Sequence, residues 1–80
     1  MSLDTLLPLD LLRPGAWGEV CDVAGEPGWV ARLAELGVRV GCRLQLLQSG
    51  PPCLVHCGGA RLSLRCDESV QVFVRPLEES

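Results

Sequence analysis

The chain has 80 residues, of which 48% are hydrophobic and 21% are charged. This length predicts one small domain spanning residues 1–80, and the composition favours an ordered globular domain over a disordered segment. All seven cations are scattered arginines and the net charge is −3. That pattern disfavours nucleic-acid binding, which depends on clustered cations. No stretch approaches the run of about eighteen apolar residues that a membrane-spanning helix needs, and no export signal is apparent, so we expect a cytoplasmic domain that is not membrane-inserted.

The first quarter of the chain predicts a leader followed by a strand. Residues 6–12 are apolar but interrupted by a proline, and we expect them to pack across the domain. Residues 16–23 alternate in the manner of a strand. One of its faces carries Trp17, Cys21 and Val23. Val20 falls on the opposite face and blurs this alternation, and Gly18 in the interior predicts a bulge or a close backbone approach.

A short helix is predicted over residues 29–36. Trp29, Leu33 and Leu36 recur at the spacing of one helical face. Gly37 follows the last periodic residue, where a left-handed cap is expected. We expect the two tryptophans, Trp17 and Trp29, to pack into the core rather than anchor a partner. If one of them is exposed, Trp29 at the start of the helix is the predicted one.

Four further strands are predicted in the second half. The first begins at Gly41 and points Cys42, Leu44 and Leu46 inward. The next is expected over residues 53–57, between a turn at residues 49–52 and a pair of glycines. The last two are expected over residues 61–65 and 70–74, with Pro76 and an acidic tail ending the domain.

These elements predict a mostly β fold, a small five-stranded antiparallel barrel with one short helix inserted after the first strand. Its core would span about residues 9–75, with a short N-terminal leader and an acidic C-terminal tail. The alternative, a ferredoxin-like α+β sheet, needs a second helix of similar length. The connection of about six residues between the last two strands is too short to supply one.

Several segments in one collinear order resemble the FeoA family of ferrous iron transport proteins. Leu12–Gly15, followed by Gly18 and Val20, resembles the opening of the family, which is a leucine and a Pro-Gly turn before a Gly-x-Val strand. Leu33–Val38 with Gly41 is similar to the end of the family's helix. The family's closing signature is resembled by Leu62–Arg65, Glu68, Val72 and Val74. The chain departs from the family at Val40, where proline is usual, at Ser69, where alanine is common, and in a shorter loop over residues 48–52.

The resemblance implies an SH3-like barrel that acts as a regulatory, non-catalytic partner of the FeoB ferrous iron permease. It implies contact with the cytosolic side of that permease. We expect no required cofactor, and self-association into a weak homo-oligomer is compatible with this role. The predicted contact surface consists of the helix, the turn after it and the loop before the third strand. Its residues are Trp29, Arg32, Leu36, Arg39, Gly50 and Pro51.

Cys53, His56 and Cys57 raise the alternative of a small metal-binding sensor or storage domain, since thiolate and imidazole suit zinc and iron. On a strand, however, the two cysteines would lie roughly 13 Å apart on one face and the histidine would face the other way. A site would have to recruit Cys42 or Cys66 from neighbouring strands. We therefore predict no intrinsic metal site and reduced thiols packed as small hydrophobes, while allowing adventitious or weak binding of zinc or iron.

No catalytic constellation is apparent in the sequence. It contains one histidine, no P-loop and no nucleophile elbow, so we predict that the chain is not an enzyme. A peptide-binding adaptor of the eukaryotic SH3 kind is disfavoured because the chain has no tyrosine and two tryptophans for an aromatic groove. An arginine row at Arg61, Arg65 and Arg43 reads as a solvated strand face that could meet an acidic patch on a partner.

Overall fold

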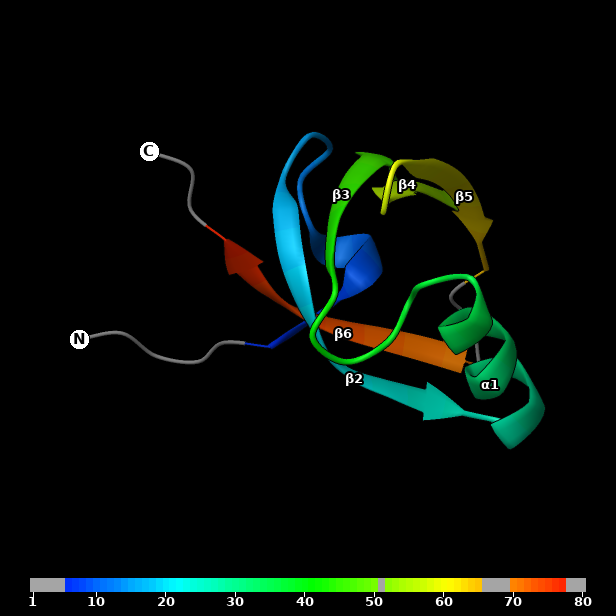
Figure 1. The fold of residues 1–80 in the computed structure, drawn as a ribbon. Helices are drawn as coiled ribbons and strands as arrows, with labels where there is room; N and C mark the ends of the chain where they lie inside the picture. Colours follow the sequence, from blue (N-terminus) through cyan, green and yellow to red (C-terminus); the bar gives the residue numbers. More distant parts are fainter. Residues whose placement is uncertain (1–5, 51, 66–69, 78–80) are drawn as a thin grey trace.

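The computed structural model describes residues 6–50, 52–65 and 70–77. Within these residues one antiparallel sheet of six strands accompanies a single α-helix. The elements are β1 (Leu7–Pro8), the 3-10 helix η1 (Leu9–Leu11), β2 (Trp17–Gly25), α1 (Pro27–Glu35), β3 (Arg43–Gln48), β4 (Cys53–Cys57), β5 (Ala60–Leu64) and β6 (Val70–Leu77). The strand order is β1-β6-β2-β3-β4-β5. The sheet is strongly curled, with β3, β4 and β5 arching over one side and α1 at one end (Figure 1).

The predicted fold class is confirmed in outline and corrected in detail. The protein is mostly β and antiparallel, with one helix inserted after the first long strand. The five-stranded closed barrel is wrong in two respects, because the predicted leader contributes a sixth strand, β1, and because β1 and β5 are unjoined edges in the described part of the chain. The leader also contributes side chains to the core. Leu9, the first residue of η1, is 0% exposed, and Leu12, immediately after η1, is 5% exposed.

A β-bulge in β2 explains why the predicted face of this strand is wrong. Val20 lies opposite Val74 and Val23 lies opposite Val72, but the register shifts between Val20 and Asp22. The extra residue, Cys21, therefore places both valines on the side of the core, although an odd number of positions separates them. Figure 1 shows β2 bending midway along its length. The face predicted from simple alternation was Trp17, Cys21 and Val23.

Two residues of this region, Gly18 and Pro76, lie opposite each other in the β2–β6 ladder. A β-carbon on Gly18 would lie 3.1 Å from Cβ of Val74, so the predicted close backbone approach is confirmed, and the bulge lies elsewhere. The prediction that Pro76 ends the last strand is wrong, since β6 continues to Leu77. Beyond Arg75 the described neighbour of β6 is β2 alone, and an edge position tolerates a residue without an N–H.

Helix α1 begins at Pro27, two residues before the predicted start, because the fixed φ of proline suits the first helical position. It ends in the predicted glycine cap. The N–H of Val38 donates to the carbonyl of Leu33 at 2.8 Å, and the N–H of Gly37 donates to that of Ala34 at 3.0 Å. Gly37 has φ +102°, which completes a Schellman motif and turns the chain toward β3.

The core is built from the strands whose alternation the sequence shows most clearly. Leu44 and Leu46 of β3 and Val55 of β4 are fully buried, while Arg43 is exposed, as predicted. The observed bounds of β4 equal the predicted ones. β3 begins two residues later than predicted, and β5 is shifted by one residue toward the N-terminus.

Candidate functional site

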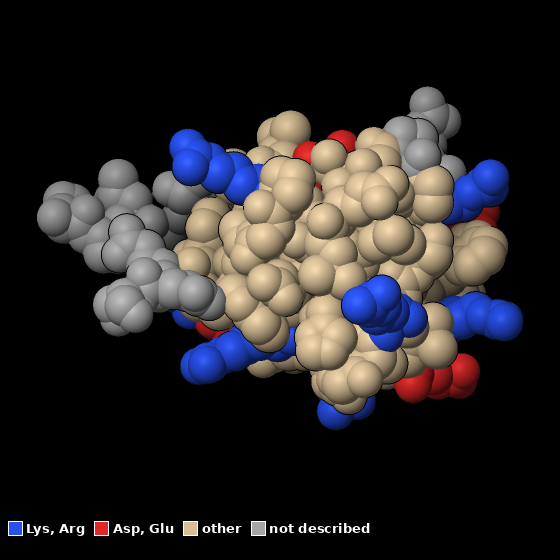
Figure 2. Space-filling model, turned by 90° about the horizontal axis from the view of Figure 1, so that it is seen from above, with Lys and Arg blue, Asp and Glu red and all other residues tan. Residues whose placement is uncertain are grey.

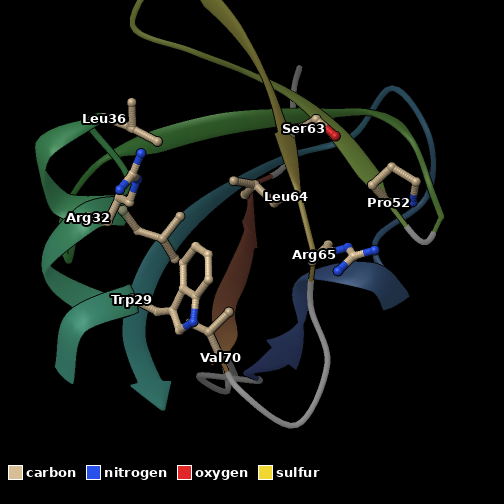
Figure 3. A pocket seen from close by; sticks show the side chains of 9 residues that line it. Trp29, Arg32, Leu36, Pro52, Ser63, Leu64, Arg65 and Val70 are labelled. Carbon is tan, nitrogen blue, oxygen red and sulfur yellow. The ribbon is translucent and has the colours of Figure 1, made fainter. Parts of the chain in front are cut away.

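A groove of about 520 Å³ separates α1 from β5 and the start of β6. Figure 3 shows α1 on one side of this groove and β5 on the other. The lining residues are Trp29, Arg32, Leu33 and Leu36 from α1, Pro52 before β4, Ser63, Leu64 and Arg65 at the end of β5, and Val70 at the start of β6. The groove is therefore assembled from segments that are far apart in the sequence.

The α1 wall follows from the spacing of four residues along the helix. Positions 29, 32, 33 and 36 lie within one helical face. Leu33, in the middle of this face, is 7% exposed and joins the core, whereas Trp29 and Leu36 at its two ends are 50% and 49% exposed. The expected core packing is wrong for Trp29, whereas Trp17 is half-buried, so Trp29 is the more exposed tryptophan, as predicted for the case that one is exposed. The helix thus buries Leu33 in the core, packs the partly buried Val30 against it, and leaves two large apolar side chains at the surface.

The side of the groove opposite α1 combines buried apolar residues with an exposed arginine. Leu64 and Val70 are 4% and 7% exposed and form the buried part of the lining. Arg65 is exposed on this wall, and Arg32 is exposed on α1 across the groove (Figure 3). Among the described residues of the lining, these two arginines are the charged ones; Asp67 and Glu68, between Arg65 and Val70 in the sequence, lie outside the described residues. The described lining therefore offers an apolar surface flanked by positive charge.

The structure brings together half of the predicted contact residues. Trp29, Arg32 and Leu36 lie in the groove. Arg39 is exposed in the connection between α1 and β3, outside the lining, and Gly50 is exposed beside the turn that precedes Pro52. Pro51 lies outside the described residues. The β5 and β6 side of the groove was missed, because no local sequence signal shows which strand faces the helix across a curled sheet.

The cysteines follow the predicted alternation of β4. Cys53 and Cys57 are 2% and 6% exposed, while His56 between them is half-buried on the other face. Cys66 lies outside the described residues. Over the described ranges, no group of three or more histidine, cysteine or acidic side chains is placed to hold a metal ion. The absence of a required cofactor stays a prediction.

Cys57 has a second thiol as its neighbour. Its Sγ lies 3.6 Å from Sγ of Cys42 and 3.5 Å from the carbonyl oxygen of Gly37. Burial raises the pKa of the Cys57 thiol to about 11, with further contributions from the hydrogen bond to Cys42 and its charge, while the nearby Arg39 guanidinium opposes the shift. Cys57 is therefore expected to be protonated at neutral pH.

This shift predicts a loss of stability at alkaline pH. A thiol whose pKa is higher in the folded state stabilises the fold below its unfolded pKa of 9.0, and the contribution disappears as the pH rises to about 11. The expected decrease in the free energy of unfolding is about 2 kcal/mol. The sequence has neither lysine nor tyrosine, the other side chains whose usual pKa values lie near this window. Urea denaturation of the reduced protein between pH 8 and about pH 11 measures the slope.

Cys57→Ala is the matched control for this pH dependence. It lowers stability at neutral pH because it removes a buried side chain, but its stability should change less between pH 9 and about pH 11. An equal slope in both proteins would assign the alkaline transition to another group.

Away from the groove, the charges of the surface are dispersed, and Leu6, Leu11 and Val40 are single exposed apolar side chains. Arg75 of β6 pairs with Glu19 of β2 on the outer face of the sheet. Figure 2 shows arginine side chains standing apart from one another around a largely uncharged centre. Nowhere in the described chain is there a helix with the length and apolar character needed to cross a membrane.

The fold and the groove define a small antiparallel β domain with a helix at one end and an exposed, partly apolar binding surface. The chain belongs to the FeoA domain family, whose model matches residues 7–76. It is similar to a crystal structure of an iron uptake regulatory protein (FeoA), with 29% identity and a TM-score of 0.80 over 91% of this chain and 100% of that one. It is also similar to the solution structure of the FeoA protein from Chlorobium tepidum, with 35% identity and a TM-score of 0.81 over 90% of this chain and 71% of that one. No curated protein matches the chain.

Proposed function

We propose that the chain is a non-catalytic accessory protein of ferrous iron uptake that binds the cytosolic face of a FeoB-type permease through the groove between α1 and β5. Membership of the FeoA family supports the association with iron uptake. The similar crystal structure is that of an iron uptake regulatory protein. In this proposal the chain works in the cytoplasm, needs no cofactor, and acts by changing the behaviour of the permease.

The observation that carries the proposal is the exposure of large apolar side chains along one groove. Trp29 and Leu36 are each about half exposed at its rim, and buried Leu64 and Val70 line its floor. Tryptophan in such a position is typical of an interface residue that contributes much of the binding energy. An apolar side chain of the permease that enters the groove would remove both rims from water, which stabilises the complex.

The charges of the groove specify the chemistry of the partner segment. Arg32 and Arg65 flank the apolar surface from opposite walls. A partner segment that complements them carries an apolar anchor flanked by aspartate or glutamate. Because exposed charges are screened by salt, the association should become slower as the ionic strength rises.

Co-purification with a detergent-solubilised FeoB-type permease from the same organism tests the proposal. The tagged wild-type chain should retain the permease, and Leu36→Ala should retain much less of it. Leu11→Ala is the control, because Leu11 is a similarly exposed leucine (63%) that does not line the groove. Circular dichroism should show the same fold for all three proteins.

Iron uptake by cells that carry these variants provides the second readout. Leu36→Ala should reduce ferrous iron uptake, and Leu11→Ala should leave it unchanged. Arg39→Ala in the same assays determines whether the contact extends to the connection between α1 and β3. The proposal fails if the wild-type chain does not retain the permease. The assignment of the surface fails if Leu36→Ala retains it as well as wild type does.

A further inference from the structure

Two thiols from different segments meet on the inner face of the sheet, outside the groove. Cys57 ends β4 and lies opposite Leu44 of β3 in the ladder. Cys42 immediately precedes β3, at the end of the connection from α1, and packs against the core. Cys57 is buried and Cys42 is half-buried. Their sulfurs are 3.6 Å apart.

This separation fits a shared metal ion better than a disulfide. Two sulfurs that are each bound at about 2.3 Å to a tetrahedral zinc ion lie about 3.8 Å from each other. A disulfide needs the two sulfurs at about 2.05 Å from each other. Bridging by a metal ion needs almost no movement of the two sulfurs, whereas a disulfide needs them to approach each other by about 1.5 Å.

An oxygen atom lies at a matching distance from one of the sulfurs. The carbonyl oxygen of Gly37 is 3.5 Å from Sγ of Cys57. A sulfur and an oxygen that share a tetrahedral zinc ion lie about 3.6 Å apart. The Schellman motif at the end of α1 holds this carbonyl in place, since Gly37 adopts φ +102° within it. The position of the oxygen is therefore set by the fold and does not depend on a mobile side chain.

We propose that Cys42 and Cys57 chelate a thiophilic divalent ion of the zinc type, with the Gly37 carbonyl and water completing its coordination. Binding replaces two S–H bonds by two metal–sulfur bonds and releases two protons to the solvent. The two thiolates neutralise the divalent ion, so the occupied site carries no net charge in a partly buried place. Across the described residues no third cysteine, histidine or acid joins the pair. The site is therefore expected to bind more weakly than a four-cysteine zinc site.

Titration of the reduced, metal-free full chain with Cd²⁺ tests the proposal, because cadmium thiolates give an ultraviolet charge-transfer band. The wild-type chain should show a band that saturates at one Cd²⁺ per chain, together with a rise in Tm at saturation. Cys42→Ser should lose both the saturating band and the rise in Tm. Cys42 is the half-buried member of the pair, so this variant is expected to fold, and circular dichroism checks that it does.

The double variant Cys21→Ser/Cys66→Ser is the matched control. It removes two other thiols and should bind one Cd²⁺ as the wild type does. Absence of a saturating band in the wild type overturns the proposal, as does a band that survives in Cys42→Ser or disappears in the double variant. The outcome is independent of permease binding, because neither cysteine lines the groove.

Discussion

Leu44→Ala is expected to lower the free energy of unfolding by about 3 kcal/mol. Leu44 is 0% exposed, lies in the middle of the core and pairs with both β2 and β4 through its backbone. Removing its isobutyl group leaves a cavity that rigid neighbouring strands cannot fill by relaxing. A domain of this size has a total stability of about 4 to 12 kcal/mol, so the change removes a large share of it. Urea denaturation followed by circular dichroism measures the loss.

Leu11→Ala is the control for this prediction, because it makes the same chemical change at a site that is 63% exposed. It should change the free energy of unfolding by about 0.5 kcal/mol or less. Similar losses in the two variants would contradict the assignment of the core, since they would mean that burial does not separate the two leucines.

The strands could be predicted where one face is buried and the other is exposed to solvent. In β3, the order arginine, leucine, glutamine, leucine produces the alternation directly, and Leu44 and Leu46 are both fully buried. In β4, glycines and prolines mark both ends of the strand, so its bounds could be predicted as well. The glycine after α1 predicted its cap, because the left-handed conformation there suits a residue without a β-carbon.

The remainder of the fold depends on contacts that the local sequence does not encode. The bulge at Cys21 is a property of how β2 pairs with β6, and it reverses the faces that simple alternation assigns. Leu7 and Pro8 form the two-residue strand β1 because they pair with the edge of β6. Two residues are too few to show a strand periodicity in the sequence.

The candidate site, too, could be predicted from the sequence only in part. The α1 wall could be predicted, because helical spacing alone puts Trp29, Arg32 and Leu36 on one face. The other wall could not, because Leu64 and Val70 reach the helix through the curl of the whole sheet. The thiol pair was anticipated in part. The spacing of the cysteines excluded a site within β4, and the 3.6 Å contact between the two sulfurs then identifies Cys42 as the partner of Cys57.

Trp29→Ala is expected to weaken binding to a FeoB-type permease at least tenfold, which corresponds to about 1.4 kcal/mol of binding free energy. The indole is 50% exposed at the rim of the groove, so its removal deprives the partner of a large apolar surface while the core stays intact. Trp29→Phe keeps an aromatic ring and should bind better than Trp29→Ala. Surface plasmon resonance with immobilised permease in nanodiscs gives the affinities, and thermal melts show whether the fold is preserved. If Trp29→Ala binds as tightly as wild type and is equally stable, the α1 rim does not contact the permease. The binding surface must then lie on another face of the domain.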